Sequence, residues 1–410
     1  MQLTNQSQHL ISIFEKEMKY THHTKATNTI LTQFYNDIYA AHSYLVQYNG
    51  LIYKTTLTPI RNPGQIPRPA VLSSKYFHAD IQSHINNFSK TEIKYTFKMF
   101  ARQITIIFVV EETNPNLQLY NKHVESMILW LHVLNKYASP RCSNTLVVYL
   151  YFTSLEKQLP NSNSTVLNEL HVNTAFTTTC PSDSEIVIYR KEEWFKVFIH
   201  ETFHNYGLDF SNMSMRECTN HILSLFPVKS DVNLFEAYTE FWAEIMNVLL
   251  FSFSHITVKS NLKDFLHNAE YLINNERTYS YFQLVKTLDF MGLNYTDLYT
   301  QSKKSDTLRK TNYNENTNVL SYYVIKTILL SNHQTFLGWC KSNNKTILQF
   351  THTRENLTSF CKYIEKHYKT AKMLEGVENA AKFMKKHPRN RFLHTNMRMS
   401  ISEGEPIHFS

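Results

Sequence analysis

Glycine and proline are scarce in this chain, at 7 and 11 of 410 residues. Collagen needs a glycine at every third position, and low-complexity or linker segments are rich in both residue types. Those classes are therefore excluded, and no self-similar period indicates a repeat protein. The 42% hydrophobic and 14% aromatic residues are instead typical of a globular protein of two or three folding units with a large core.

Cysteines are also few, and none of them belongs to a C-x-x-C motif. An odd number at wide spacing argues against a secreted disulfide scaffold, so we predict a reducing, intracellular and cytoplasmic location. The spacing also leaves no cysteine pair for a structural zinc site. The five cysteines are Cys142, Cys180, Cys218, Cys340 and Cys361.

Long apolar runs are absent as well. The most apolar stretch, residues 245–256, is shorter than the roughly 20 residues that a transmembrane helix needs. The first ten residues are polar and lack the apolar segment of a signal peptide. We therefore expect no membrane span.

The chain is moderately basic, with a formal net charge of +8 from 42 basic and 34 acidic residues. Such a charge attracts acidic partners. A basic C-terminal tail that contacts nucleic acid is one interpretation, and a solvated end of the chain is the other. The basic residues that gather near the C-terminus are Lys382, Lys385, Lys386, Arg389, Arg391 and Arg398.

Runs of β-branched and aromatic residues alternate with helical spacing in the middle of the chain, and helical spacing dominates after residue 231. This order predicts an α+β fold. The expected strands are 97–110 (one long or two short), 145–152, 171–179 and 185–189. The expected helices are 121–137, 192–206, 233–253, 318–330 and 358–386.

We expect three regions along the chain. Residues 1–90 form a mostly helical N-terminal region, residues 91–260 a catalytic domain with a mixed sheet, and residues 261–410 a helical C-terminal domain with a basic tail. The stretch 59–69 holds four prolines and a glycine, so it is predicted to be a loop and is the best linker in the chain.

The expected helix at 192–206 carries an H-E-x-x-H motif, from His200 through Glu201 to His204. Residues four apart share a helix face, so both imidazoles can bind one Zn²⁺. Glu201 is turned by about 100° from His200, so it can act as general base beside the metal. The aromatic neighbours bury this helix, where such polar groups are costly unless something satisfies them. The alternative is a pair of histidines without a metal.

The third ligand has several candidates. Gly207 stands where the metzincin pattern H-E-x-x-H-x-x-G-x-x-H has its glycine, but Phe210 occupies the position of the third histidine. Phenylalanine cannot bind a metal, and Asp209 is one place early. His221, on the following segment, is a more distant candidate.

An acidic helix at 233–253 offers further candidates. Glu236, Glu240 and Glu244 are spaced by four residues and share one face of an otherwise apolar helix. A cation opposite them would offset the cost of their burial. Asn233 and Glu236 also fit a capping box, in which the glutamate only binds the helix N-terminus.

The two helices together resemble the gluzincins, a group of zinc metallopeptidases, over residues 185–244. The resemblance implies a zincin-like catalytic domain in which Glu236 is the third ligand, with Glu240 in its place as the alternative. It also implies that Glu240 holds a histidine ligand, at a position where the family usually has aspartate. Zincins bind their substrate as an extended strand along a sheet edge, and residues 171–179 are the candidate edge.

The predicted function is therefore a zinc-dependent metallopeptidase that acts on a protein or peptide. His200, His204 and Glu236 would hold the Zn²⁺, and Glu201 would take a proton from the metal-bound water and pass it to the leaving amine. The candidate donors to the carbonyl oxygen are Tyr206, Tyr238, His221 and His255.

Two other functions stay open. One is a catalytically silent interaction or packaging protein with a zincin fold, whose basic tail contacts nucleic acid. The other is a zinc hydrolase that acts on something other than a peptide. The composition, rich in asparagine, lysine, isoleucine and tyrosine, together with the motif resembles zincin-like proteins of large DNA viruses, which implies association with a virion as a further location.

Overall fold

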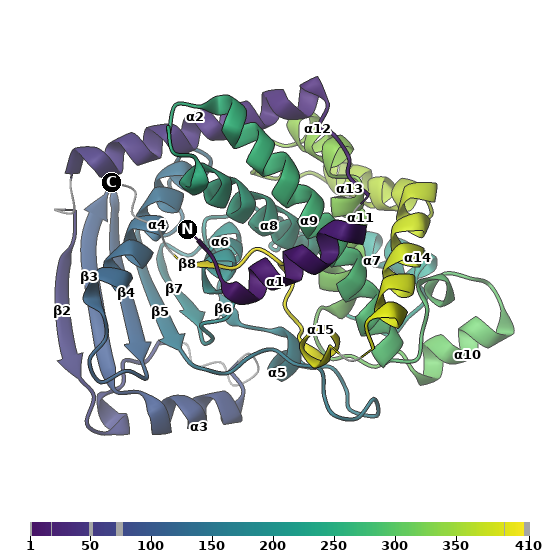
Figure 1. Cartoon of the computed structure of the whole chain (residues 1–410), viewed down its shortest axis with the longest axis horizontal. Coiled ribbons are helices and arrows are strands. Elements are labelled where there is room, and N and C mark those ends of the chain that lie inside the picture. The colour runs from purple at the N-terminus through teal and green to yellow at the C-terminus, as the bar shows by residue number, and fades with distance from the viewer. Residues whose placement is uncertain (1, 18, 49–51, 71–76, 389, 406–410) are drawn as a thin grey trace.

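A mixed sheet forms one side of the molecule, and a group of helices forms the other (Figure 1). This arrangement confirms the α+β prediction at the level of fold class. The computed structural model describes residues 2–17, 19–48, 52–70, 77–388 and 390–405.

The six strands of the sheet have the order β2-β3-β4-β5-β7-β6. The pairs β4–β5 and β5–β7 are parallel, and the other neighbours are antiparallel. Strand β6 therefore lies at one edge. The strands of this sheet are β2 (Lys54–Pro59), β3 (Thr91–Met99), β4 (Arg102–Val110), β5 (Thr145–Phe152), β6 (Ala175–Thr177) and β7 (Asp183–Ile188), and a separate antiparallel pair joins β1 (Gln2–Leu3) to β8 (Gly404–Glu405).

The helices connect the sheet to the far side of the molecule through a chain of contacts. Helix α6 packs against β6, β7 and α8, and α8 in turn packs against α9 and the π-helical segment η4 (Leu320–Ile325). None of the helices in the described ranges is both long and apolar enough to cross a membrane. The α-helices are α1 (Asn5–Phe14), α2 (Lys25–Tyr48), α3 (Ala79–Phe88), α4 (Leu117–Asn135), α5 (Glu169–Val172), α6 (Trp194–Asn205), α7 (Arg216–Leu225), α8 (Leu234–His255), α9 (Leu262–Phe290), α10 (Lys303–Thr311), α11 (Lys326–Ser331), α12 (His333–Asn343), α13 (Arg354–His367), α14 (Ala371–Lys386) and α15 (Arg391–Thr395).

Both faces of the sheet are buried at β5, which explains the nearly continuous apolar sequence of this strand. Val148 and Leu150 belong to the main core, which also contains residues of α4 and α6. Tyr149 and Tyr151 belong to a second core on the other face, beneath α3. The hydroxyl of Tyr151 donates to the carbonyl oxygen of Pro67 at 2.6 Å, so the proline-rich loop also packs on this face.

The expected helices and strands differ from the observed ones in three places. Residues 318–330 contain η4 followed by α11 rather than one α-helix. Residues 358–386 are divided between α13 and α14, and Thr370 caps the second helix by accepting from the N–H of Met373. Residues 171–179 include the end of α5, so only the three residues of β6 are strand.

The N-terminal region contributes to the sheet as well as to the helices. Strand β2 pairs with β3 along its whole length, across the boundary expected at residue 90. The stretch 59–69 is a loop with one 3₁₀ turn, as predicted, but Ile60 and Ile66 bury it against the sheet, so it does not act as a free linker. The domain boundaries at residues 90 and 260 stay a prediction.

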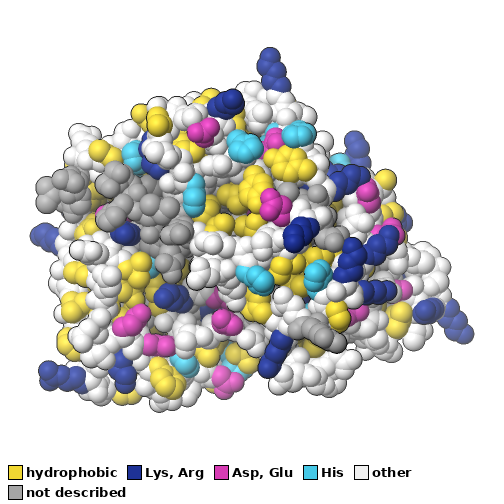
Figure 2. Space-filling view, in the orientation of Figure 1, with side chains coloured by type: hydrophobic (Ala, Val, Ile, Leu, Met, Phe, Trp, Pro, Cys, Tyr) yellow, Lys and Arg dark blue, Asp and Glu magenta, His cyan; other side chains and the backbone are white. Residues whose placement is uncertain are grey.

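The C-terminal stretch is not the solvated basic tail that was expected. Arg398 is fully buried and forms an ion pair with Glu403 at 3.2 Å. Lys382 and Lys385 are exposed on α14, and Figure 2 shows lysine and arginine side chains gathered over that helix. Arg389 lies outside the described residues. The basic character therefore belongs to a folded helix surface.

Four of the five cysteines form disulfide bonds, so the prediction of reduced cysteines is wrong for them. Cys142–Cys180 joins the loop before β5 to the loop after β6, with a Cα–Cα distance of 4.7 Å. Cys218–Cys361 joins α7 to α13, at 6.1 Å. Cys340 is buried and free. The wide spacing in sequence hid these pairs because the fold brings distant segments together, and the cysteine argument for a reducing compartment no longer holds.

Candidate metal centre

Helix α6 presents the motif from a fully buried position. All of its side chains are buried, in keeping with its apolar and aromatic sequence. The N–H of Leu208 donates to the carbonyl oxygen of Phe203 at 2.9 Å, and that of Gly207 donates to His204 at 3.1 Å. Gly207 has a φ of +67°, so the helix ends in the left-handed glycine conformation that this pattern of hydrogen bonds requires. The predicted end of the helix is confirmed.

Three ligand atoms converge where the motif faces the first turn of α8. The Nε2 atoms of His200 and His204 are 3.1 Å apart. Oε2 of Glu236 lies 3.1 Å from Nε2 of His200 and 3.5 Å from that of His204. Ligands at about 2.0–2.1 Å from a tetrahedral zinc ion are separated from each other by about 3.3 Å. The three residues therefore fit a zinc ion, and they are the three that the sequence indicated.

Each histidine is oriented by a carboxylate on its other ring nitrogen. Nδ1 of His200 lies 2.8 Å from Oε2 of Glu240, and Nδ1 of His204 is hydrogen-bonded to Asp209. Glu240 also forms a buried ion pair with Lys196. Such partners fix which nitrogen faces the metal and raise the basicity of the ligand. The contact of Glu240 with His200 agrees with the expectation. The contact of Asp209 with His204 was not predicted, because the position of Asp209 in the motif suggested only a third ligand.

Glu236 does not cap its helix. The side chain of Asn233, at the N-cap of α8, makes no capping hydrogen bond and instead donates to Oδ1 of Asn318 at 2.9 Å. Oε2 of Glu236 accepts a hydrogen bond from the hydroxyl of Tyr322 at 2.8 Å. The carboxylate is thereby held toward the two imidazoles, and the capping-box alternative is wrong.

Charge is shared closely among the histidines and carboxylates. Burial lowers the pKa of His200, but hydrogen bonds to Glu236 and Glu240 outweigh it, so this pKa lies above its usual value. The pKa of His204 is raised further, because the charges of Asp209 and Glu236 outweigh burial. In turn, the two imidazoles hold the pKa of Glu236 well below its usual range, against the effect of burial. The carboxylates thus favour positive charge at the centre of the group, where a cation would lie.

Two cavities meet at the motif, and Glu201 and Tyr322 line each of the two. Burial raises the pKa of Glu201, although the two imidazoles oppose this effect. Its carboxylate makes no hydrogen bond to another residue in the described part of the chain, so it is free to exchange a proton with a small molecule. The larger cavity, of about 270 Å³, is lined by Asn173, Ala175, Phe176, Thr177, Thr179, His200, Glu201, His204, Ser211, Asn233, Phe235, Glu236, Asn318 and Tyr322.

The edge strand β6 runs along the larger cavity and is tied to the end of α6. The side-chain amide of Asn205 donates to Oγ1 of Thr177 at 3.0 Å, and the N–H of Cys180 donates to the carbonyl oxygen of His204 at 3.2 Å. A Cβ atom on Gly207 would lie 3.2 Å from the sulfur of Cys142, so the disulfide packs against the same helix end. The expected edge therefore lies beside the motif, although only three of its residues are strand.

The four residues proposed as donors to a carbonyl oxygen do not line either cavity. The ring of Tyr206 lies beneath the guanidinium of Arg102, and the hydroxyl of Tyr238 donates to a backbone carbonyl. His221 forms an ion pair with Glu365 at 3.2 Å, and His255 lies in the last turn of α8. Tyr322 is the phenol that faces the site. No pattern in the sequence indicates Tyr322, because it belongs to a distant π-helical segment, a feature common at functional sites.

Replacing Asp209 by asparagine is expected to weaken zinc binding by about 10–100-fold. Asparagine keeps the size of the side chain but cannot hold the imidazole of His204 with a carboxylate. The zinc dissociation constant of the purified variant, measured by competition with a chelating dye, checks this. Lys196 and Glu240 are untouched, so an unchanged dissociation constant would mean that the contact does not support a metal ligand.

Comparison with known proteins identifies one viral relative. No protein-family model and no solved structure match the chain. The chain is 22% identical over 245 residues to "Uncharacterized protein R210" of Acanthamoeba polyphaga mimivirus. The match covers 56% of this chain and 62% of the relative, so the chain spans less than two thirds of the length of the relative. The name of that protein states no activity, and the similarity is a hint of a viral relationship.

Proposed function

We propose that this chain is a zinc-dependent metallopeptidase, with Zn²⁺ held by His200, His204 and Glu236. The observation that carries the proposal is the triangle of ligand atoms, whose edges of 3.1, 3.1 and 3.5 Å fit one tetrahedral ion. No other histidine, cysteine or acidic side chain of the described residues joins this group. A fourth position is thus left for water or substrate, as in catalytic zinc sites rather than structural ones.

The chemistry divides between the ion and the side chains around it. A bound Zn²⁺ would supply a Lewis acid that acidifies water and polarises a carbonyl oxygen. Glu201 stands beside the three ligands, accepts the proton of the attacking water and returns it to the leaving amine. Tyr322 lines both cavities and donates its hydroxyl proton to Glu236 in this structure; we assign the same hydroxyl, turned from Glu236 toward a bound substrate, as the donor to the substrate carbonyl oxygen.

A peptide is the substrate that the surroundings favour. Strand β6 is the last strand in the order of the described sheet, where it is hydrogen-bonded to β7, and binding of an extended peptide along this strand is the mode that we propose. That strand lines the cavity that contains the motif. A peptide paired along it would pass its backbone across the ligand group. Hydrolysis of another carbonyl substrate would use the same side chains, and digestion of a peptide library separates the two.

The zinc content of the purified chain tests the proposal. We expect about one zinc per chain in the wild type. A His200→Ala variant should lose the zinc, because only two of the three protein ligands that a catalytic zinc site needs would remain. A matched His267→Ala variant, which removes an exposed histidine from α9, should keep it. The proposal is wrong if His200→Ala retains the zinc of the wild type, or if the wild type neither contains nor takes up zinc.

A further inference from the structure

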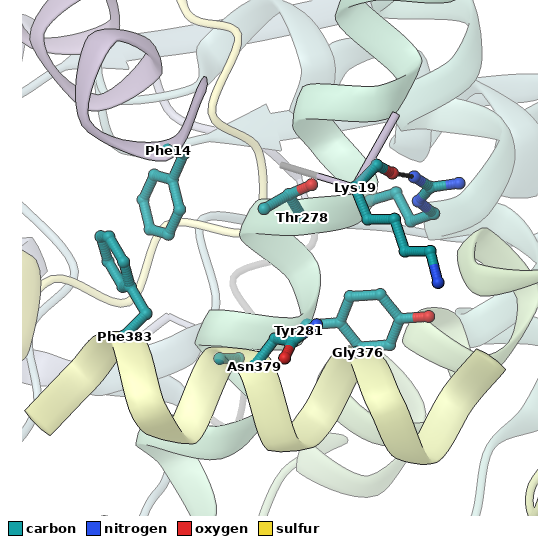
Figure 3. Close-up of a pocket in the computed structure, with 9 residues that line it drawn as sticks. Phe14, Lys19, Thr278, Tyr281, Gly376, Asn379 and Phe383 are labelled. Atoms are coloured by element: carbon teal, nitrogen blue, oxygen red, sulfur yellow. Dashed lines mark hydrogen bonds between the residues drawn. The ribbon is translucent and has the colours of Figure 1, made fainter. Parts of the chain in front are cut away.

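A second cavity lies between α9 and α14 and shares no lining residue with the candidate metal centre. Its volume is about 310 Å³. A smaller apolar recess, lined in part by Phe14 and Phe383, adjoins it, and Figure 3 shows the residues around this recess along α14. The residues that line the larger cavity are Lys19, Thr21, Arg277, Tyr281, Lys372, Glu375, Gly376 and Asn379.

The guanidinium of Arg277 is buried in this wall without a carboxylate partner. The side chain belongs to a residue only 3% exposed. It donates to two neutral oxygens, Oγ1 of Thr21 at 2.6 Å and the carbonyl oxygen of Lys19. No acidic side chain in the described ranges forms an ion pair with it. Because a buried charge without a counter-charge is costly, the wall is stabilised by any anion that enters the cavity.

The cavity also holds a surplus of positive charge. Lys372, on the first turn of α14, forms no ion pair with any described residue. The one carboxylate in the wall, that of Glu375, is already paired with Lys19 at 2.8 Å. Arg277 and Lys372 are therefore two cations that line the same cavity and have no carboxylate partner among the described residues.

The ionisable neighbours respond to this positive charge. Burial, and then the charge of Arg277, lower the pKa of Lys372 to about 8. The pKa of the nearby buried His333 lies well below its usual value, because of burial and then the charges of His23, Arg277 and Lys372. Beyond burial, Arg277 lowers the pKa of Lys372, and Arg277 and Lys372 both lower the pKa of His333, so the two cations add positive charge at the cavity.

Gly376 shapes the wall by allowing a close approach. A Cβ atom at this position would lie 2.2 Å from Cζ of Tyr281, so only glycine lets α14 lie directly on that ring. Glycine is unfavourable within a helix relative to alanine, and the contact with Tyr281 compensates for it here. Lys372, Gly376 and Asn379 lie on one face of α14. Lys372 and Asn379 therefore line the cavity together with Arg277, and Figure 3 shows Gly376 of α14 against the ring of Tyr281.

We propose that this cavity binds a phosphate group, as inorganic phosphate or as the end of a phosphomonoester. The two positive charges of Arg277 and Lys372, which have no carboxylate partner among the described residues, match the two negative charges of a phosphate dianion. A carboxylate would balance only one of them. Arg277 offers a planar set of N–H donors, and Lys372 offers a compact charge that can turn toward a phosphate oxygen. Asn379 adds a neutral donor from the same wall. The open volume leaves room for an organic group beyond the phosphate.

Isothermal titration calorimetry at constant ionic strength and pH 7 tests the proposal with three ligands: inorganic phosphate, adenosine monophosphate and acetate. We expect the two phosphate compounds to bind and acetate to bind at least about tenfold more weakly, since it balances one charge instead of two. Tighter binding of the nucleotide than of inorganic phosphate would identify a phosphomonoester as the ligand. Equal affinity would identify free phosphate.

The matched variants are Lys372→Met and Lys385→Met, both on α14. Lys372 faces the cavity, whereas Lys385 is exposed in the last turn of the helix. The Lys372→Met substitution is expected to raise the phosphate dissociation constant by about tenfold or more, and the Lys385→Met substitution to leave this constant unchanged. The proposal is overturned if the wild type binds no phosphate compound at about 10 mM, if acetate binds equally well, or if the two variants bind alike.

Discussion

A Glu201→Gln variant is expected to keep its zinc and to lose peptide hydrolysis by roughly 10²–10⁴-fold, the usual contribution of a general base. Glutamine has the shape of glutamate, so the ligand triangle of His200, His204 and Glu236 is left intact. It cannot accept a proton from water, and the carboxylate of Glu201 has no structural partner among the described residues whose loss would disturb the fold. The measurement is the initial rate on a digested peptide library, paired with the zinc content of the same sample.

The control for this variant is Glu217→Gln. Glu217 forms an exposed ion pair with Arg354 at 2.6 Å, on the surface of α7, so its loss should change neither rate nor stability by much. If Glu201→Gln and Glu217→Gln cleave peptides equally fast, the hydrolysis does not come from this site. If the wild type holds zinc but cleaves no peptide, the chain is a hydrolase of another substrate or an interaction protein.

The motif and its helix were predictable because the information is local. The aromatic neighbours of His200 predict a buried helix, and the four-residue spacing to His204 places both imidazoles on one face. Gly207 then ends the helix with its positive φ. The position of Glu236 was narrowed by a second local pattern, the acidic stripe on an apolar helix. That stripe did not distinguish its members: Glu236 and Glu240 reach the histidines, but Glu244 forms a core ion pair with Lys326.

The remaining parts of the site depend on how the chain folds back. Asp209 reaches His204 because the turn at Gly207 reverses the direction of the chain. Helical spacing describes only residues within the helix, so it does not predict this contact. Tyr322 approaches Glu236 from a π-helical segment that packs on α8. The contact of Cys142 with Cys180 likewise follows from the order of the strands, which places their loops side by side.

The same reason explains why the prediction of a solvated basic end is wrong for Arg398. This residue lies in the stretch that follows α15, which is irregular and buried, whereas Lys382, Lys385, Lys386 and Arg391 are exposed. Of this group, the exposed lysines on α14 and Arg391 on α15 are the residues that could contact nucleic acid. Charge substitutions such as Lys385→Met test that alternative function, whereas a truncation of the chain would remove part of the core.

Removing the residues after Thr395 is expected to prevent folding altogether. Three side chains of the removed segment, those of Met397, Met399 and Ile401, are almost fully buried. Burial of each contributes about 1.5–3 kcal/mol to stability. Their loss alone would remove a large part of the roughly 5–15 kcal/mol that stabilises a typical domain.

The backbone of the same segment also neutralises two buried carboxylates. Glu193 accepts from the N–H groups of Met399 and Ser400 at 3.1 and 2.7 Å. Glu276 accepts from the N–H groups of Ile401 and Ser402 at 3.0 and 2.9 Å. Without these donors Glu276 is left buried with no ion-pair partner among the described residues, a loss that costs about 3–5 kcal/mol, whereas Glu193 keeps its ion pair with Lys157.

The truncated chain should therefore show no cooperative thermal unfolding by circular dichroism, and it should accumulate as insoluble protein. A chain that ends at residue 405 is the control, because it retains every one of these contacts and the pairing of β1 with β8. If the chain ending at Thr395 unfolds cooperatively near the temperature of the control, the segment is an accessory and the buried acids must find other partners. Since Met399 also lines the smaller cavity beside Glu201, loss of the segment would then still be expected to change the reaction rate at the metal centre.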